Sequence, residues 1–243
     1  MKKLLLLSTI AFAAVAIPFA GKAETVFYKA GPFDKLQVRG DIDVVYRCNP
    51  DSTGMVAYDD SICKGEPLEV TASNGKVSIK VIPENAHDVT LPTVYVYSDF
   101  LTEAKNEGNG LMRIEHAATV PTFKATLIGN GKIVVSNLTA SSVKGNLETG
   151  NGEIVIAGKC REASLRMVGT GTIMADQLEA DKVTCFCLGS GTIGCWAETK
   201  LDVRGLSSTE IYYRGNPELK KVGAAKLIPL DESAEPADGN KEE

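Results

Sequence analysis

Gly129-Asn130-Gly131-Lys132-Ile133-Val134-Val135 is one copy of a motif that recurs through residues 101–220. Two glycines flank a small polar residue, and an isoleucine follows the first glycine by four positions in four of the copies. The glycine pairs are Gly108 and Gly110, Gly129 and Gly131, Gly150 and Gly152, Gly169 and Gly171, and Gly189 and Gly191. The pairs follow one another at a nearly constant interval of about 20 residues, and such a period predicts stacked copies of one small unit.

Apolar residues alternate on both sides of each glycine pair. After the pair they occupy two positions on one strand face, for example Ile154 and Ile156. Before the pair they alternate in the same way, as in Phe123, Ala125 and Leu127. Residues two apart lie on the same face of a β-strand. Each copy is therefore predicted to be a strand, a tight glycine corner and a second strand, which together we call a rung.

Two copies depart from the pattern. Before Gly150 the apolar set is displaced by one residue, which predicts a bulge or an extra residue in that rung. A sixth copy has Ser207-Ser208-Thr209 in place of the glycines, with Leu201, Val203, Ile211 and Tyr213 at the apolar positions. Terminal repeats of a stack are usually atypical. We attribute the corner glycines to positive φ angles. A phosphate-binding role is not expected, because each pair opens a strand and not a helix.

The expected fold is all-β: a right-handed β-solenoid, or β-helix-like stack, of about six rungs. Residues 24–100 form a β-rich N-terminal part, and 101–220 form the repeat solenoid. Right-handedness is expected because parallel crossovers are almost always right-handed. In the N-terminal part, Asn74-Gly75 lies between two alternating apolar runs and predicts a hairpin. Arg39-Gly40-Asp41 matches an integrin-binding tripeptide, but a strand–turn–strand pattern already explains its glycine.

The two ends of the chain have distinct compositions. Residues 1–23 predict a secretory signal peptide, with two lysines, an uncharged apolar run and small residues before the cleavage site. After its removal we expect no transmembrane segment. Residues 221–243 form a C-terminal extension, and from 231 it holds six acids, one lysine and no large apolar side chain. This acidic tail is predicted to be disordered. The protein is expected in the periplasm, on the outer-membrane surface or outside the cell.

Charge gives no sign of a polyanionic partner. Removing residues 1–23 takes away three lysines and no acid, so the formal net charge falls from −5 to −8. The acidic tail holds −5 of that charge, which leaves about −3 on residues 24–230. Nucleic acid is therefore not an expected partner, and neither is an anionic membrane. No motif predicts a cofactor.

Six cysteines in an exported chain favour disulfides. Cys48 and Cys63 flank an irregular segment and are the favoured pair, whose bridge would contribute on the order of 3 kcal/mol. Cys185, Cys187 and Cys195 fall on inward positions and are expected to be small core residues. The alternative is a thiolate metal site that also includes Cys160, but the spacing is unlike that of structural zinc sites. We predict no metal site and leave the pairing of these four cysteines open.

Catalytic residues are not predicted. His87 and His116 have no nucleophile in a recognisable setting beside them, and no hydrolase or metalloprotease motif occurs. Acids near the corners could in principle pair, as in β-helices that cleave glycans, but their registers differ between rungs. These acids are Glu103, Glu107, Glu115, Glu148 and Glu153.

The run from Phe33 to Val44, the five glycine corners and the closing Ile211–Pro217 resemble the putative auto-transporter adhesin, head GIN domain family of exported Bacteroidetes proteins. The resemblance spans roughly residues 33–220. It implies a solenoid-like all-β fold and adhesion, and it implies no catalytic residues. Family members often have Gly-Ser-Gly-Asp at the corners, and the missing aspartate here argues against calcium. In such a bacterium, Ser52 and Ser61 would resemble acceptors for O-glycosylation.

The function expected from these observations is a non-enzymatic envelope or surface protein. It would bind a glycan or a protein through extended β faces. Two alternatives remain open at this stage. One is a structural envelope module whose solenoid ends pair into homo-oligomers. The other is a glycan-active enzyme, which requires two or three acids to converge on one outer face.

Overall fold

The computed structural model describes residues 25–59, 61, 66–86 and 89–230. β-Strands make up 68% of the described residues, and the only helices among them are two short 3-10 helices, η1 (Pro50–Ser52) and η2 (Pro83–Asn85). The strands are β1 (Thr25–Lys29), β2 (Lys35–Arg39), β3 (Val44–Cys48), β4 (Met55–Asp59), β5 (Leu68–Ser73), β6 (Lys76–Val81), β7 (Val94–Ser98), β8 (Glu103–Glu107), β9 (Leu111–His116), β10 (Val120–Ile128), β11 (Lys132–Thr149), β12 (Glu153–Met167), β13 (Thr172–Cys187), β14 (Thr192–Gly205), β15 (Glu210–Arg214), β16 (Glu218–Gly223) and β17 (Lys226–Pro229).

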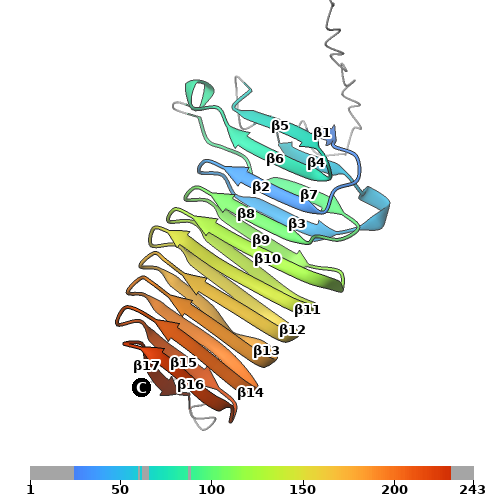
Figure 1. The fold of residues 1–243 in the computed structure, drawn as a ribbon. Helices are drawn as coiled ribbons and strands as arrows, with labels where there is room; N and C mark the ends of the chain where they lie inside the picture. Colours follow the sequence, from blue (N-terminus) through green and yellow to red (C-terminus); the bar gives the residue numbers. More distant parts are fainter. Residues whose placement is uncertain (1–24, 60, 62–65, 87–88, 231–243) are drawn as a thin grey trace, which may run out of the picture.

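The strands stack as a β-solenoid with two parallel faces (Figure 1). The first face contains β6, β2, β8, β10, the second halves of β11 to β14, and β16. The second face contains β7, β3, β9, the first halves of β11 to β14, β15 and β17. The all-β solenoid expected from the sequence is therefore confirmed.

Apolar side chains of equivalent rungs lie directly over one another inside the stack. Ile133, Ile154, Ile173, Ile193 and Ile211 are consecutive register partners, and all are 0% exposed. Strands about 4.8 Å apart bring such residues into contact, so the row is a continuous apolar ladder. The alternation in the sequence marks the buried face correctly.

The rung formed by β2 and β3 comes first in the chain but second in the stack. β2 pairs with β6 on one side and with β8 on the other, and β3 lies in the same way between β7 and β9. The chain therefore leaves after β3, builds β4 to β7, and returns to continue at β8. The parallel rows run across residue 100 without a break. The boundary expected between residues 24–100 and 101–220 corresponds to the point after which the rungs follow one another in chain order.

The corner glycines serve a purpose different from the one expected. Among the ten, only Gly129 and Gly150 have positive φ angles, of 115° and 91°. A Cβ on any of the ten would instead come within 3.0 Å of an atom of the preceding rung, in most cases a carbonyl oxygen. Close stacking of backbone on backbone, and not the left-handed conformation, is what generally requires glycine at these corners.

The irregular copies also have structural explanations. In β11, Leu147 is the partner of Leu127 and Thr149 is the partner of Ile128, so Glu148 is the extra residue of the expected bulge. In the last copy, the hydroxyls of Ser207 and Thr209 both donate to the carbonyl oxygen of Gly189. The side chains of this corner thus satisfy a polar group of the corner below.

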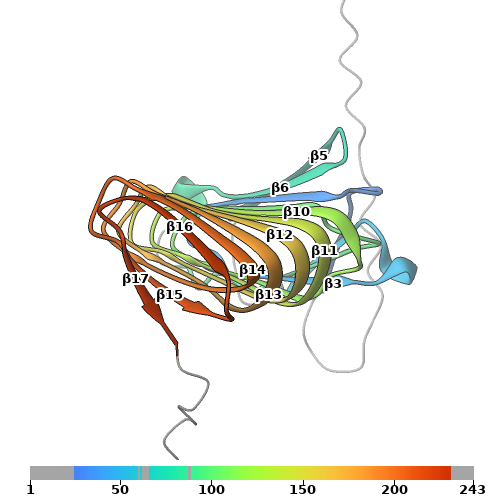
Figure 2. The same cartoon turned by 60° about the horizontal axis from the view of Figure 1, so that its bottom comes forward.

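Different arrangements close the two ends of the stack (Figure 2). At the N-terminal end, β5 pairs antiparallel with β6 through the expected Asn74-Gly75 hairpin, β4 pairs antiparallel with β7, and β1 with β4. At the C-terminal end, β16 and β17 each pair on one side only within the described residues. Neither described helix is long and apolar enough to cross a membrane.

Candidate functional site

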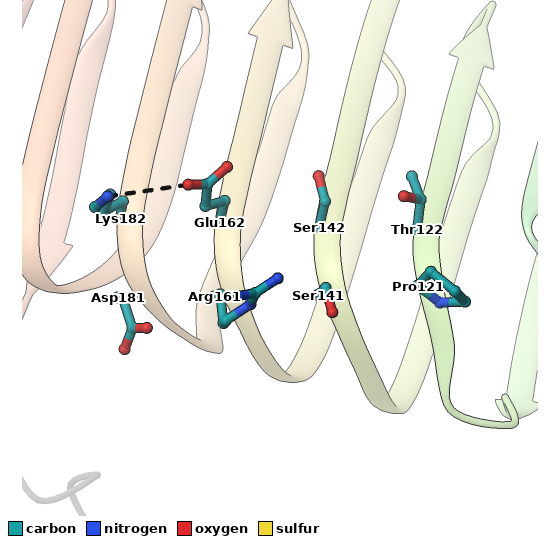
Figure 3. Close-up of a pocket in the computed structure, with 8 residues that line it drawn as sticks. All are labelled: Pro121, Thr122, Ser141, Ser142, Arg161, Glu162, Asp181 and Lys182. Atoms are coloured by element: carbon teal, nitrogen blue, oxygen red, sulfur yellow. Dashed lines mark ion pairs between the residues drawn. The ribbon is translucent and has the colours of Figure 1, made fainter.

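A shallow polar groove runs along the edge where the long strands bend from the second face to the first. We call it the corner groove; its volume is about 480 Å³. Four successive rungs contribute two equivalent residues each. These residues are Pro121 and Thr122, Ser141 and Ser142, Arg161 and Glu162, and Asp181 and Lys182. Figure 3 shows them as two rows that cross the rungs.

Strand register holds the upper row of the corner groove in place. Thr122, Ser142, Glu162 and Lys182 are consecutive partners in β10 to β13. The next residue along each strand, such as Phe123 or Val183, is buried in the core. The backbone under the groove is therefore fixed by the apolar ladder, while the polar side chains project outward.

The charged groups of the corner groove are accessible to a ligand. Lys182 Nζ lies 4.0 Å from Glu162 Oε1, and both side chains are more than 60% exposed. An ion pair of this kind contributes roughly 0 to 1 kcal/mol, so a ligand can replace it at little cost. Hydroxyls, one guanidinium, one ammonium and two carboxylates give the groove donors and acceptors along its whole length.

The acids considered as a catalytic pair are scattered. Glu103 and Glu107 lie on β8 of the first face, where Lys124 and Arg39 pair with them. Glu115 and Glu153 lie on the second face, paired with Arg47 and Lys132. Glu148 is the bulge residue. Topology therefore does not bring these five carboxylates together, and the requirement for a glycan-cleaving site is not met by them.

Glu107 is held as a carboxylate within its own network. Partial burial opposes ionisation, but hydrogen bonds from Lys105 and Arg39 outweigh it, so the pKa of Glu107 is lowered. The side-chain amide of Gln37 also donates to Glu107, over 2.8 Å. A carboxylate with three donors is suited to joining β2 and β8 and not to accepting a proton in catalysis.

The cysteines of the last glycine rungs are core residues. Cys185, Cys187 and Cys195 are at most 1% exposed. Cys185 and Cys195 lie in contact, which together with burial raises the pKa of Cys185, and burial raises that of Cys187 to about 11. Burial likewise raises the pKa of Cys160 to about 11. Neutral buried thiols pack as small apolar groups.

No cluster of three or more potential ligands, counting His, Cys, Asp and Glu, occurs in the described part of the chain. Cys48 Sγ lies 2.9 Å from the carbonyl oxygen of Asp99 and has no disulfide partner among the described residues. Cys63 lies outside them, so the Cys48–Cys63 bridge stays a prediction. His87 and the segments 1–24 and 231–243 also lie outside the described residues. His116 is exposed at the end of β9.

Two further sequence features have clear surroundings. Ser52 is half-buried in η1 and accepts from Asn49, whereas Ser61 is exposed, and its hydroxyl is 2.6 Å from Asp59. Their modification stays a prediction. In the integrin-like tripeptide, Arg39 pairs with Glu107, and Asp41 accepts from the backbone and the side chain of Asn109. The charged groups of Arg39 and Asp41 are therefore both paired with residues of the neighbouring rung.

The corner groove was not predicted from the sequence. A signal was present, because Ser141-Ser142, Arg161-Glu162 and Asp181-Lys182 recur between the apolar runs with the same period as the glycine corners. Polar residues between strands are ordinarily interpreted as loop, and only the register shows that these four pairs face the same side.

The fold and the groove define a class: a β-solenoid whose successive rungs present polar side chains in register, with no cluster of three or more potential metal ligands in the described residues. The sequence matches the family described as "Putative auto-transporter adhesin, head GIN domain" over residues 32–217. The chain belongs to this family, as the resemblance indicated. A search of curated proteins found no match.

Solved structures share the fold. A putative adhesin from Bacteroides fragilis is 20% identical, with a TM-score of 0.73 over 86% of this chain and 96% of that one. A putative adhesin from Parabacteroides merdae is 18% identical, with a TM-score of 0.62 over 87% and 98%. A putative lipid binding protein from Parabacteroides distasonis is 21% identical, with a TM-score of 0.60 over 87% and 98%. None of these descriptions names an enzyme.

Proposed function

We propose that this protein is an exported, non-enzymatic recognition protein of the bacterial envelope or cell surface, and that it binds a glycan or a protein along the corner groove. The observation that carries the proposal is the row of outward-facing, mostly polar side chains that four successive rungs present over a packed apolar core. A ligand lying across the rungs makes several weak contacts, and their sum gives affinity when both partners are pre-organised.

The groove chemistry favours a polar, extended ligand. It contains charges of both signs, and its two rows contain no aromatic ring. A highly charged polymer of one sign gains little from such a mixture, because each attractive group has a repulsive neighbour. The adhesin descriptions of the family and of two structural relatives agree with a recognition role.

The test is a binding screen of residues 24–230 against an array of glycans and extracellular-matrix proteins. The matched variant is Arg161→Glu with Lys182→Glu, which reverses two exposed groove charges without touching the core. An unrelated β-solenoid is the control for non-specific adhesion. We expect selective binding by the natural protein and at least tenfold weaker binding by the variant. A blank array, or equal binding by the variant, would contradict the proposal.

A further inference from the structure

A small cavity lies at the N-terminal end of the stack (Figure 1), where four segments that are distant in the sequence meet. These segments are the loop between β1 and β2, the loop between η1 and β4, the turn between β5 and β6, and the segment after β7. We call this space, whose volume is about 170 Å³, the end cavity. Its lining includes Pro32, Phe33, Asp34, Thr53, Asp99 and Phe100.

Backbone hydrogen bonds tie the segments of the end cavity together. The amide of Ala30 donates to the carbonyl oxygen of Gly54 over 2.7 Å. The amide of Asp34 donates to the carbonyl oxygen of Gly75 over 3.0 Å, and the carbonyl oxygen of Asp34 accepts from the amide of Thr102 over 2.7 Å. The cavity is therefore already formed, and the binding of a small group requires little further ordering of the protein.

Two aromatic rings and a proline form the apolar part of the wall. Phe33 is 6% exposed and belongs to the core, whereas Phe100 is 44% exposed. An exposed aromatic side chain beside a cavity offers apolar surface that a ligand can cover, and the face of such a ring attracts a cation. This wall suits a ligand that combines an apolar stem with a positive charge.

Two carboxylates line the same cavity without a positive partner. Asp34 Oδ2 accepts a hydrogen bond from the hydroxyl of Thr102 over 2.6 Å. Asp99 Oδ1 accepts one from the hydroxyl of Thr53. In the part of the chain that the structure describes, neither carboxylate has an ion-pair partner. Each hydrogen bond uses one oxygen, so the second oxygen of each carboxylate can accept from a cationic donor.

We propose that the end cavity binds a lysine side chain of a partner protein. The methylene stem of the lysine packs against the rings of Phe100 and Pro32. Its ammonium group has three donors, which suit the carboxylates of Asp34 and Asp99. This site is separate from the corner groove, so the inference goes beyond the function proposed above and does not depend on it.

The size and chemistry of the cavity favour lysine over other occupants. Pockets for drug-sized molecules have volumes of roughly 300 to 1,000 Å³, so this smaller cavity is suited to a single side chain and not to a sugar. An uncharged apolar side chain would remove water from the carboxylates without replacing its hydrogen bonds. Calcium requires about six to eight oxygen ligands, which a wall of rings does not supply.

A second hollow supports a polypeptide as the source of the lysine. It has a volume of about 230 Å³ and shares Pro32, Phe33 and Gly75 with the end cavity. Its lining also includes Ser73 and Asn74, which are exposed polar residues of the hairpin between β5 and β6. Residues on either side of the inserted lysine can lie in this hollow and form hydrogen bonds there. A free amine would leave the hollow unused.

The experiment titrates residues 24–243 with Nα-acetyl-lysine methylamide and follows the backbone amide shifts by NMR. We expect saturable shifts concentrated at cavity residues such as Thr53, Gly75 and Phe100. The dissociation constant should be on the order of 10 mM, as suits a single side chain in a small site. No saturable shift at tenfold higher concentration, or shifts of equal size all over the surface, overturns the inference.

Three further probes identify the occupant. The norleucine and Nε-acetyl-lysine analogues keep the apolar stem but have no charge, and methyl glucosaminide has an amine on a sugar ring. We expect each of them to bind at least tenfold more weakly than the lysine probe, because each lacks the charge or the stem. Equal or tighter binding of any of the three overturns the assignment to lysine.

Variants locate the binding. Asp34→Asn and Asp99→Asn each remove one charge and keep the shape of the side chain, and we expect at least tenfold weaker binding for each. Phe100→Ala should also weaken binding. Asp51→Asn is the matched control, because it removes the same charge from an exposed side chain two residues before Thr53 that does not line the cavity. Dispersed amide shifts elsewhere show that a variant is folded. Undiminished binding by both cavity variants, or an equal loss with Asp51→Asn, overturns the inference.

Discussion

The two ends of the stack have parallel strands in the same register but are closed in different ways. At the N-terminal end, antiparallel β4 and β5 cover β7 and β6. At the C-terminal end, all six residues of β16 are exposed, and two of them, Leu219 and Lys221, occupy inward positions over Leu201 and Val203. Added antiparallel strands close the N-terminal end. At the C-terminal end, the last described rung has features that disfavour the pairing of a further strand.

Edge protection at the C-terminal end has three components. Lys221 is exposed and places a charge at the register position where the neighbouring strand has the buried Val203, and β16 and β17 are short. The backbone amides of Lys226 and Leu230, at the two ends of β17, donate hydrogen bonds toward the β15 side. Because successive backbone amides of a strand point in opposite directions, the amide of residue 229 faces the open side. Pro229 has no N–H, so no donor is available there. Such features prevent strand addition. The two ends thus differ in how strand pairing stops: added antiparallel strands at one end, and a short, charged and proline-containing rung at the other.

The largest expected difference between the two ends is in how much a substitution lowers the free energy of unfolding. Tyr46 is 0% exposed between β7 and β9, whereas Leu219 is 46% exposed. Tyr46→Ala should lower the free energy of unfolding by about 3 to 5 kcal/mol. Leu219→Ala should lower it by less than about 1 kcal/mol, because it removes few buried contacts. Urea unfolding followed by circular dichroism measures both, and equal losses would break the comparison.

Alkaline pH should affect the N-terminal end through the same tyrosine. Burial, partly offset by the hydrogen bond to Ser98, raises the pKa of Tyr46 to about 12 from 10.0. The neutral phenol is thus favoured in the folded protein, so its contribution is complete below pH 10 and is lost as the pH rises through about 12. The free energy of unfolding should fall by roughly 2 to 3 kcal/mol over this range.

The free energy of unfolding, measured from pH 9 to pH 12, tests this pH dependence. The range spans the pKa of Tyr46 in the unfolded chain, 10.0, and reaches its pKa in the folded protein, about 12. Tyr46→Phe should flatten the decline, and Tyr213→Phe at the opposite end should leave it unchanged. A Tyr46→Phe profile that follows the natural protein would show that another group controls alkaline unfolding.

Removing the edge protection should make the C-terminal end adhesive. We expect the natural protein to be monomeric by light scattering, and the double variant Lys221→Leu with Pro229→Val to form concentration-dependent dimers or longer assemblies. The alternative of natural end-to-end oligomers makes the opposite prediction. Association of the natural protein, or a variant that remains monomeric, would contradict this account of the end.

The smallest expected effects concern surface ion pairs. Arg39 and Glu107 are far apart in the sequence and join two rungs at 2.8 Å, while Lys226 and Glu210 lie 3.3 Å apart at the C-terminal end of the stack. Double-mutant cycles should give a coupling of about 0.5 to 1 kcal/mol for the first pair and close to zero for the second. Equal couplings would show that the out-of-order rung gains nothing from this contact.

The regular rungs could be predicted because their contacts are periodic. Ile133 and Ile154 are separated by one repeat of the sequence and are neighbours in the fold, so the period itself encodes the pairing. The place of β2 could not be predicted. Lys35 of this strand has Lys76 and Glu103 as its two neighbours, and neither separation corresponds to a single repeat.

The candidate site illustrates a second limit. The corner groove follows the period of the repeat but is polar, and the search for strands in the sequence depends on apolar residues. The sequence does not show that the polar residues of four rungs meet on one side, because that depends on the register of the strands.

The measurement that tests the central claim most directly compares recognition by a corner with recognition by an end. The array ligand bound by residues 24–230 is titrated against the natural protein, the Arg161→Glu and Lys182→Glu variant, and the Leu219→Ala variant at the C-terminal end. The account predicts that the groove variant loses at least tenfold in affinity and that Leu219→Ala binds as the natural protein does. Loss with Leu219→Ala and normal binding by the groove variant would contradict it.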